Sequence, residues 1–259
     1  MFEIYFNSLA IIILAVTIIW IISVVITDAS IVDLFWGMGF VVTNTYYFFV
    51  TGEPTTVQWV LLILVLIWGL RLSIYLSIRN IGKGEDFRYQ KFRQDYGPKR
   101  YWWISFFQTF LLQGVIIWII SLPLAATNYY SVSNELNLFS YLGIILWVIG
   151  FAFEAGGDFQ LARFKRNPDN KGKVLDKGFW KYTRHPNYFG DSAVWWGYGL
   201  FSISVGAYWQ SIGSIAMTFL IIRISGVFLL ERTLNDKPGY KEYIERTSTF
   251  LPWFPKKLK

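Results

Sequence analysis

The chain has 259 residues, of which 54% are hydrophobic, 20% aromatic and only 16% charged, a composition too apolar for an ordinary soluble domain of this length. It has no cysteine and one histidine, which excludes a disulfide and a thiol nucleophile and leads us to expect no metal site. The basic residues behind the net charge of +7 lie beside apolar runs, which indicates membrane topology and phosphate or headgroup contacts rather than a nucleic-acid partner.

Seven apolar runs have roughly the length that a helix needs to cross a bilayer. They lie at 4–26, 31–50, 57–79, 104–125, 137–160, 190–206 and 208–231. Because backbone groups in lipid must be satisfied within the segment, we expect an all-α polytopic membrane protein with seven transmembrane helices in one membrane domain, 1–259. Nearly all Lys and Arg fall in alternate connections, so the positive-inside rule places the N-terminus outside and the C-terminus in the cytoplasm.

Charged side chains interrupt the second and third runs. Asp33 lies about one turn into the second run, where the helix dipole could hold it or where it could line a substrate cavity. Arg71 and Tyr75 share one face of the third run, and Arg79 follows one turn further on. An arginine within a span predicts a functional site, whereas Arg79 could also be an interfacial anchor.

The connection after the third run, GKGEDFRYQKFR, reads mostly as a solvated run of charges. Its Tyr89 could still fold back over a site. In the fourth run Gln108 and Gln113 are expected to make contacts between helices rather than to take part in chemistry.

The end of the fifth run carries two carboxylates, Glu154 and Asp158, on one helix face, followed by Lys165. Like charges placed in this way need cations or hydrogen-bond donors, which a ligand or an internal salt-bridge network could supply. The last run carries Arg223 and Glu231, two turns apart.

The stretch 178–199, GFWKYTRHPNYFGDSAVWWGYG, concentrates polar and aromatic groups before an apolar helix. Pro186 can start that helix and leaves backbone N–H groups near Asn187 and Tyr188 that can face an anion. The further candidates of this stretch are Tyr182, Arg184, His185, Asp191 and Trp195. After the last run, the tail with Phe250–Pro255 is typical of an interfacial segment with aromatic anchors.

Several of these motifs resemble the steroid 5-alpha reductase superfamily, and most closely its bacterial integral membrane members. The resemblance rests on EAGGDFQ, GFWKYTRHPNYFGD, WWGYG and LERTLNDKPGYKEYIERTSTFLPWFP, and extends to VDLFWGMGF and GKGEDFRYQKFR, so it covers most of the chain. The most specific piece, RHPNYFG, is shared with membrane methyltransferases that act on isoprenylcysteine or phospholipids.

The resemblance implies a seven-helix enzyme of the bacterial inner membrane that binds NADPH from the cytoplasmic side. Residues 1–136 would form the substrate side and 137–259 the cofactor-binding half. By position, the cofactor contacts would be Asp158, Lys165, Tyr182, Asn187, Asp191 and Arg223, with Arg71 similarly placed. To these we add Arg79, Glu154, Arg184, His185, Tyr188, Trp195 and Glu231 as candidates.

Two positions bear on the chemistry that the resemblance implies. Asp33 falls where the family has a glutamate that binds the substrate carbonyl, but Trp68 replaces the family's tyrosine. Either Tyr75 or Tyr89 would take the role of that tyrosine, or the carboxylic acid would act alone. Glu231 replaces another family tyrosine and is reminiscent of the methyltransferases.

We therefore expect an NADPH-dependent reductase of a carbon–carbon double bond conjugated to a ketone in a steroid-like or other apolar lipid. A protonated Asp33, kept neutral by an apolar site, would donate a hydrogen bond to the carbonyl oxygen. The alternatives are an S-adenosylmethionine-dependent membrane methyltransferase and a non-catalytic lipid-binding protein. The enzyme is expected to be a monomer in the bilayer.

Overall fold

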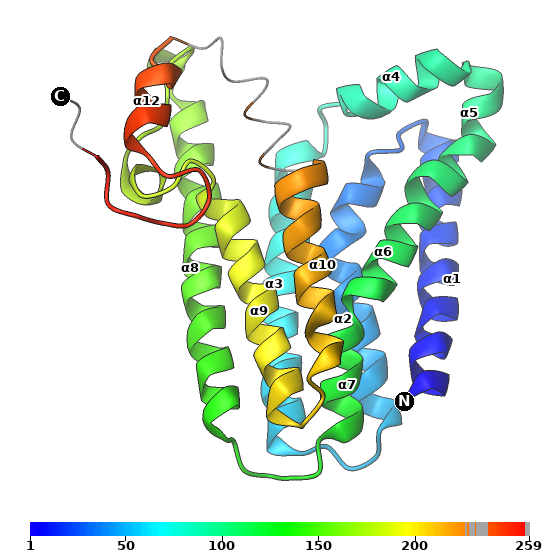
Figure 1. Cartoon of the computed structure of the whole chain (residues 1–259). Coiled ribbons are helices and arrows are strands. Elements are labelled where there is room, and N and C mark those ends of the chain that lie inside the picture. Colours follow the sequence, from blue (N-terminus) through cyan, green and yellow to red (C-terminus); the bar gives the residue numbers. More distant parts are fainter. Residues whose placement is uncertain (226, 228–230, 232–237, 257–259) are drawn as a thin grey trace. The chain divides into compact units, whose positions relative to one another are not determined.

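The computed structural model describes residues 1–225, 227, 231 and 238–256, and the regular structure of this part of the chain is helical (Figure 1). Within it, four segments are long and apolar enough to cross a membrane: Phe2–Ile26, Thr56–Asn80, Pro98–Ile120 and Leu138–Arg166. A shorter apolar segment is Trp209–Ile224. The chain is therefore an all-helical, polytopic membrane protein, as the composition predicts.

The chain forms two compact units. Unit 1 is Met1–Leu136 with Ser204–Gln210, and unit 2 is Asn137–Ile203 with the described part of Ser211–Lys259. The helices of unit 1 are α1 (Phe2–Ile26), α2 (Ile31–Val50), α3 (Thr56–Asn80), α4 (Phe87–Tyr96), α5 (Pro98–Ser105), η1 (Phe106–Leu111), α6 (Leu112–Ile120) and α7 (Leu122–Tyr130). Those of unit 2 are α8 (Leu138–Arg166), η2 (Pro168–Asn170), η3 (Gly178–Lys181), α9 (Pro186–Ser204), α10 (Ile212–Phe219), η5 (Leu220–Ser225) and α12 (Tyr240–Arg246); the short turn η4 (Trp209–Ser211) joins the two.

The central helix of unit 1 is α2, which packs against α1, α3, α6 and α7. Its closest neighbour is α3, because a Cβ atom at Gly37 would lie 2.4 Å from the carbonyl oxygen of Gly69. Phe40 and Trp68 fill the space beside this crossing and are fully buried. Two glycines thus let the backbones of α2 and α3 meet, which is the packing that membrane helices use where no hydrophobic effect drives them together.

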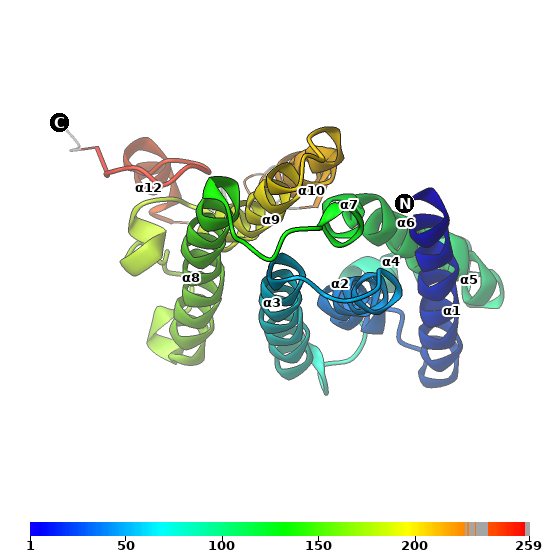
Figure 2. The same cartoon turned by 90° about the horizontal axis from the view of Figure 1, so that it is seen from below.

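In unit 2, α8 and α9 lie side by side (Figure 2). Gly143, Gly150 and Gly157 recur every seven residues along α8 and so share one face. A Cβ atom at Gly150 would lie 2.6 Å from the carbonyl oxygen of Gly190 on α9, and one at Gly143 would lie 3.0 Å from that of Gly197. A Cβ atom at Gly157 would lie 3.1 Å from the side chain of Pro186, so the first turn of α9 lies against the second half of α8.

Most predicted runs coincide with helices, and the differences have local causes. The first three agree within two residues, whereas α8 continues six residues past the predicted end because its last turn is basic, which favours a helix C-terminus. The fourth run was predicted to continue through 125, but α6 ends at Ile120 and α7 starts with Pro123 at its first turn, since proline removes a helix hydrogen bond. The seventh run lies partly outside the described residues.

Replacing Gly37 by alanine tests the contact between α2 and α3. The new methyl group must push the backbone of α3 away, so Gly37→Ala should lower the free energy of unfolding by about 1–3 kcal/mol, measured by thermal unfolding in detergent. The control is Gly114→Ala, whose Cβ meets only the methyl groups of Ile12 and Val16 at 3.1–3.4 Å. Equal effects of the two substitutions would contradict this account of the packing.

Candidate functional site

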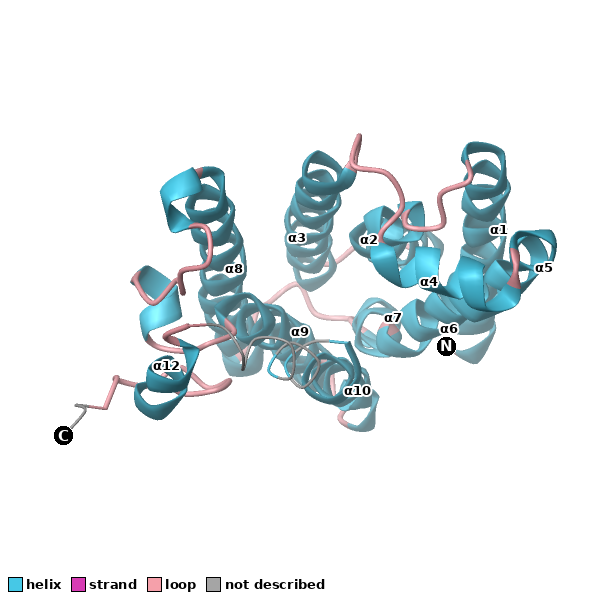
Figure 3. Cartoon of the chain, turned by 90° about the horizontal axis from the view of Figure 1, so that it is seen from above, coloured by secondary structure: helices cyan, strands magenta, loops and turns pink. Residues whose placement is uncertain are grey.

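In unit 1, α4 lies over the end of the bundle at which α2 begins (Figures 1 and 3). The connection from α3 turns at Gly82 and Gly84, whose φ angles of 81° and 76° favour glycine. Asp86 then caps α4 by accepting a hydrogen bond from the backbone N–H of Arg88 at 3.0 Å. Just before this cap, Glu85 accepts a hydrogen bond from the backbone N–H of Ala29 at 2.9 Å. These local features bring the first turn of α4 onto the first turn of α2.

The contact between these two turns centres on Asp33. The hydroxyl of Tyr89 donates a hydrogen bond to Oδ1 of Asp33 at 2.7 Å, and the guanidinium of Arg88 donates one to Oδ2 at 2.7 Å. From α6, the side-chain amide of Gln113 lies 3.3 Å from Oδ1 of Asp33 and 3.4 Å from the hydroxyl of Tyr89. We call Asp33, Arg88, Tyr89 and Gln113 the Asp33 cluster.

The surroundings of Asp33 are ionic and not the apolar site that the sequence suggested. The guanidinium of Arg88 forms an ion pair with this carboxyl group, a partner that an apolar pocket would not offer. Burial and the negative charge of Asp33 raise the pKa of Tyr89 well above its usual value. Tyr89 therefore keeps its proton over the physiological range and is the hydrogen-bond donor of the pair.

Sequence reasoning missed two members of the cluster. Arg88 lies in a connection that reads as solvated charge, and its side chain is indeed 46% exposed, so only its position next to Tyr89 could have indicated it. Gln113 was assigned to helix contacts. An amide in an otherwise apolar helix was the available signal.

The remaining candidates of unit 1 lie on α3. Tyr75 lies under the guanidinium of Arg79, whose carbon is 5.7 Å from the ring centroid. Arg79 also donates to the side chain of Asn80 at 3.0 Å and is exposed, as expected of an interfacial anchor. Arg71 lies two turns before Arg79 and is partly buried.

In unit 2, Arg184 uses all five of its N–H donors within the chain. Two go to Glu231 at 3.0 Å each, two to the carbonyl oxygens of Ile244 and Thr247 at 3.2 and 2.7 Å, and one to the hydroxyl of Thr249 at 2.8 Å. The side chain is only 7% exposed. Arg184 thus ties the stretch before α9 to Glu231 and to the segment around α12.

Glu231 is equally well satisfied. Besides Arg184, its Oε1 accepts hydrogen bonds from Nε2 of His185 at 2.8 Å and from the hydroxyl of Tyr240 at 3.0 Å. Arg184 has no N–H left for a ligand, and Glu231 already accepts four hydrogen bonds. Arg184, His185 and Glu231 were each predicted to contact a cofactor, but the geometry gives them a bracing role, and direct contact of Arg184 with a cofactor would require breaking this network.

The other predicted cofactor residues lie on α8, on η5, on α9 and in the stretch that leads into α9. The amide of Asn187 donates to Oδ1 of Asp158 at 3.2 Å, and Glu154 lies buried one turn earlier on α8. Tyr188 stacks on His185 with ring centroids 5.8 Å apart, and the carbonyl of Tyr182 accepts from the backbone N–H of Trp253. Along the same helix Asp191 is partly buried and Trp195 fully buried, whereas Lys165 on α8 and Arg223 on η5 are exposed.

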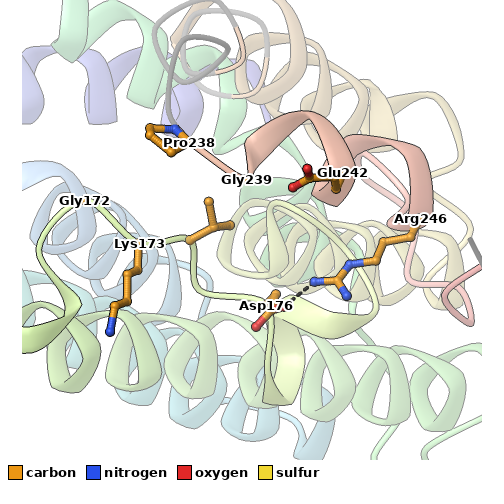
Figure 4. A pocket seen from close by; sticks show the side chains of 8 residues that line it. Gly172, Lys173, Asp176, Pro238, Gly239, Glu242 and Arg246 are labelled. Atoms are coloured by element: carbon orange, nitrogen blue, oxygen red, sulfur yellow. Dashed lines mark hydrogen bonds and ion pairs between the residues drawn. The ribbon is translucent and has the colours of Figure 1, made fainter.

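Unit 2 also has an open pocket of about 500 Å³ between the 172–176 connection and α12 (Figure 4). Asp176 and Arg246 form an ion pair across it, and Lys173 and Glu242 also line it. None of its residues was predicted to belong to the site. In the described part of the chain, no group of three His, Cys, Asp or Glu is placed to hold a metal ion.

The fold is that of an all-helical membrane protein, with the Asp33 cluster in unit 1 and the network of Arg184 and Glu231 in unit 2. A family model described as "Protein of unknown function (DUF1295)" matches residues 19–247, and the chain belongs to that family. No curated protein and no solved structure matches the chain.

The bracing role of Arg184 leads to a stability prediction. Arg184→Ala leaves the carboxylate of Glu231 without its main partner, so the free energy of unfolding should fall by about 3–5 kcal/mol, measured by thermal unfolding. Arg246→Ala is the control, because its ion pair with Asp176 is about one third exposed on each side and such pairs contribute about 0–1 kcal/mol. If both variants lose the same stability, the network does not brace the unit.

Proposed function

We propose that this chain is an NADPH-dependent reductase of a carbon–carbon double bond conjugated to a ketone, acting on a steroid-like or similarly apolar lipid. The observation that carries the proposal is the hydrogen bond of 2.7 Å between Tyr89 and Asp33. It joins a carboxylate on the second helix to a tyrosine, the pair that the resemblance to the steroid 5-alpha reductases implies, although the tyrosine comes from α4 and not from position 68.

Tyr89 is the donor to the substrate carbonyl in this proposal. During reduction negative charge grows on the carbonyl oxygen, and a hydroxyl that keeps its proton can stabilise that charge as a hydrogen-bond donor. Asp33 orients the hydroxyl, and Arg88 and Gln113 hold Asp33 in place. On substrate binding, the hydroxyl of Tyr89 would rotate and donate its hydrogen bond to the carbonyl oxygen instead of to Asp33. Water would supply the proton to the α-carbon.

The residues around the start of α9 fit a nucleotide cofactor in part. Asp158 and Asn187 offer groups that can bind ribose or amide, and exposed Lys165 and Arg223 can pair with phosphates. The first-turn N–H groups of α9 add anion-binding capacity. NADPH would supply the hydride; Arg184, His185 and Glu231 would keep the binding stretch in place.

The same proposal includes the finer topology. Seven spans with the N-terminus outside would place the Asp33 cluster and the start of α9 towards the cytoplasm, where NADPH is available. The basic last turn of α8 and the basic connections near it support this orientation. A single membrane domain that works as a monomer, with a substrate that enters from lipid, completes the proposal.

Ligand-dependent thermal stability tests the cofactor. NADPH at about 100 times its Kd should stabilise the detergent-purified protein by about 2.7 kcal/mol, with a smaller effect of NADH. Stabilisation by S-adenosylmethionine instead would favour a methyltransferase. An unchanged unfolding temperature with all three ligands would contradict an enzymatic role that uses any of them.

Replacing Tyr89 by phenylalanine tests the donor. Tyr89→Phe should lower kcat for enone reduction by about 10²–10³-fold, as removal of one oxyanion donor does, with little change in NADPH-induced stabilisation. Tyr96→Phe on the same helix is the control, because Tyr96 is 44% exposed and outside the cluster. Full turnover by Tyr89→Phe would remove Tyr89 from the mechanism.

A further inference from the structure

The tail after α12 loops back past the end of α8 that lies near α12 before it turns outward (Figure 1). Three backbone hydrogen bonds and one from a side chain hold this loop. The N–H of Arg184 donates to the carbonyl of Ser248, that of Trp253 to Tyr182 and that of Lys256 to Arg246, each at 2.9 Å, and the hydroxyl of Thr183 donates to the carbonyl of Phe250 at 2.9 Å. The tail is thus an ordered part of unit 2.

The side chains of this ordered tail are nevertheless strongly exposed. Leu251 is 67%, Trp253 73% and Phe254 76% exposed, and Pro252 and Pro255 stiffen the backbone between them. Three large apolar side chains held rigidly outward cost free energy in water. Their exposure indicates that another apolar phase covers them.

The depth of the tail along α8 identifies that phase. At about 1.5 Å per residue, about 20 residues of α8 cross the roughly 30 Å of hydrocarbon, so a span that begins near Leu138 reaches the far boundary near Asp158. Phe250 of the tail contacts Phe189 with ring centroids 6.1 Å apart, and Phe189 contacts Phe153 at 5.1 Å. The tail therefore lies at the level where α8 leaves the hydrocarbon.

The charged side chains near the tail are also of the kind expected at the boundary of the hydrocarbon. Lys177, Lys181 and Lys256 flank the apolar side chains and are exposed. Aromatic residues with lysines beside them are typical of the boundary between acyl chains and headgroups, where the ring lies in the interface and the ammonium groups meet lipid phosphates.

We propose that Phe250–Lys256 is an interfacial anchor of unit 2. Leu251, Trp253 and Phe254 insert between the headgroups of the leaflet nearest α12, and the flanking lysines bind anionic headgroups. Because Thr247 and Thr249, which directly precede this segment, accept hydrogen bonds from Arg184, an anchored tail also helps to hold the bracing network of Arg184 and Glu231 in place. The anchor does not depend on the reductase proposal.

The absence of native cysteine makes a depth measurement clean. Spin labels are placed on Trp253→Cys and Phe254→Cys, on Lys241→Cys of α12 as the aqueous reference, and on Ile145→Cys, 55% exposed on α8, as the lipid reference. Collision rates with oxygen and with a water-soluble nickel chelate are measured in nanodiscs of phosphatidylcholine, with and without phosphatidylglycerol. Thermal unfolding of each variant confirms that it folds as the parent does.

The anchor predicts that labels at 253 and 254 collide with oxygen more than with nickel, close to the label at 145, and that phosphatidylglycerol increases this ratio. Nickel collision rates equal to those at 241 would overturn the anchor. Low rates with both reagents would overturn it in favour of a protein partner. An equal ratio in the two lipid compositions would overturn the part played by anionic headgroups.

Discussion

The cost of taking a charge out of water governs both units of this protein. An isolated carboxylate at a membrane helix costs several kcal/mol, whereas one that accepts several charged hydrogen bonds is tolerated. Asp33 accepts from Arg88, Tyr89 and Gln113, and Glu231 accepts four hydrogen bonds from three side chains. In each unit, the hydrogen bonds to one carboxylate therefore hold a polar connecting segment against the helices.

The two carboxylates differ in how much of the hydrogen-bonding capacity around them is left for a ligand. In the network of Glu231 and Arg184, all five N–H donors of the arginine are used and the carboxylate accepts four hydrogen bonds, so the network serves to hold chain segments together. The Asp33 cluster is more open: Arg88 is 46% exposed, and Tyr89 makes its bond to Asp33 through a single hydroxyl that can rotate. This difference is why the chemistry is assigned to Asp33 and Tyr89, and the bracing to Arg184.

Much of the fold follows from the sequence, because a run of about 20 apolar residues can only be a helix in lipid. Asp33 and Tyr89 were both selected from the sequence, but their contact spans 56 residues and depends on how Gly82 and Gly84 turn the chain. The partner Arg88 could not be distinguished from solvated charge. Likewise, Arg184 and Glu231 were both candidates for cofactor contact, yet only the geometry reveals that they bind each other and that all N–H groups of Arg184 are used.

The central claim is that Tyr89, oriented by Asp33, polarises a ketone while NADPH reduces the adjoining double bond. Isotope transfer tests it most directly: the purified protein in lipid is given NADPH deuterated at the reactive carbon of its nicotinamide and a set of flat, apolar enones, and the products are analysed by mass spectrometry and NMR. The account predicts one deuterium at the β-carbon of a saturated ketone product. Absence of deuterated product from every enone, with NADPH shown to bind, would contradict it.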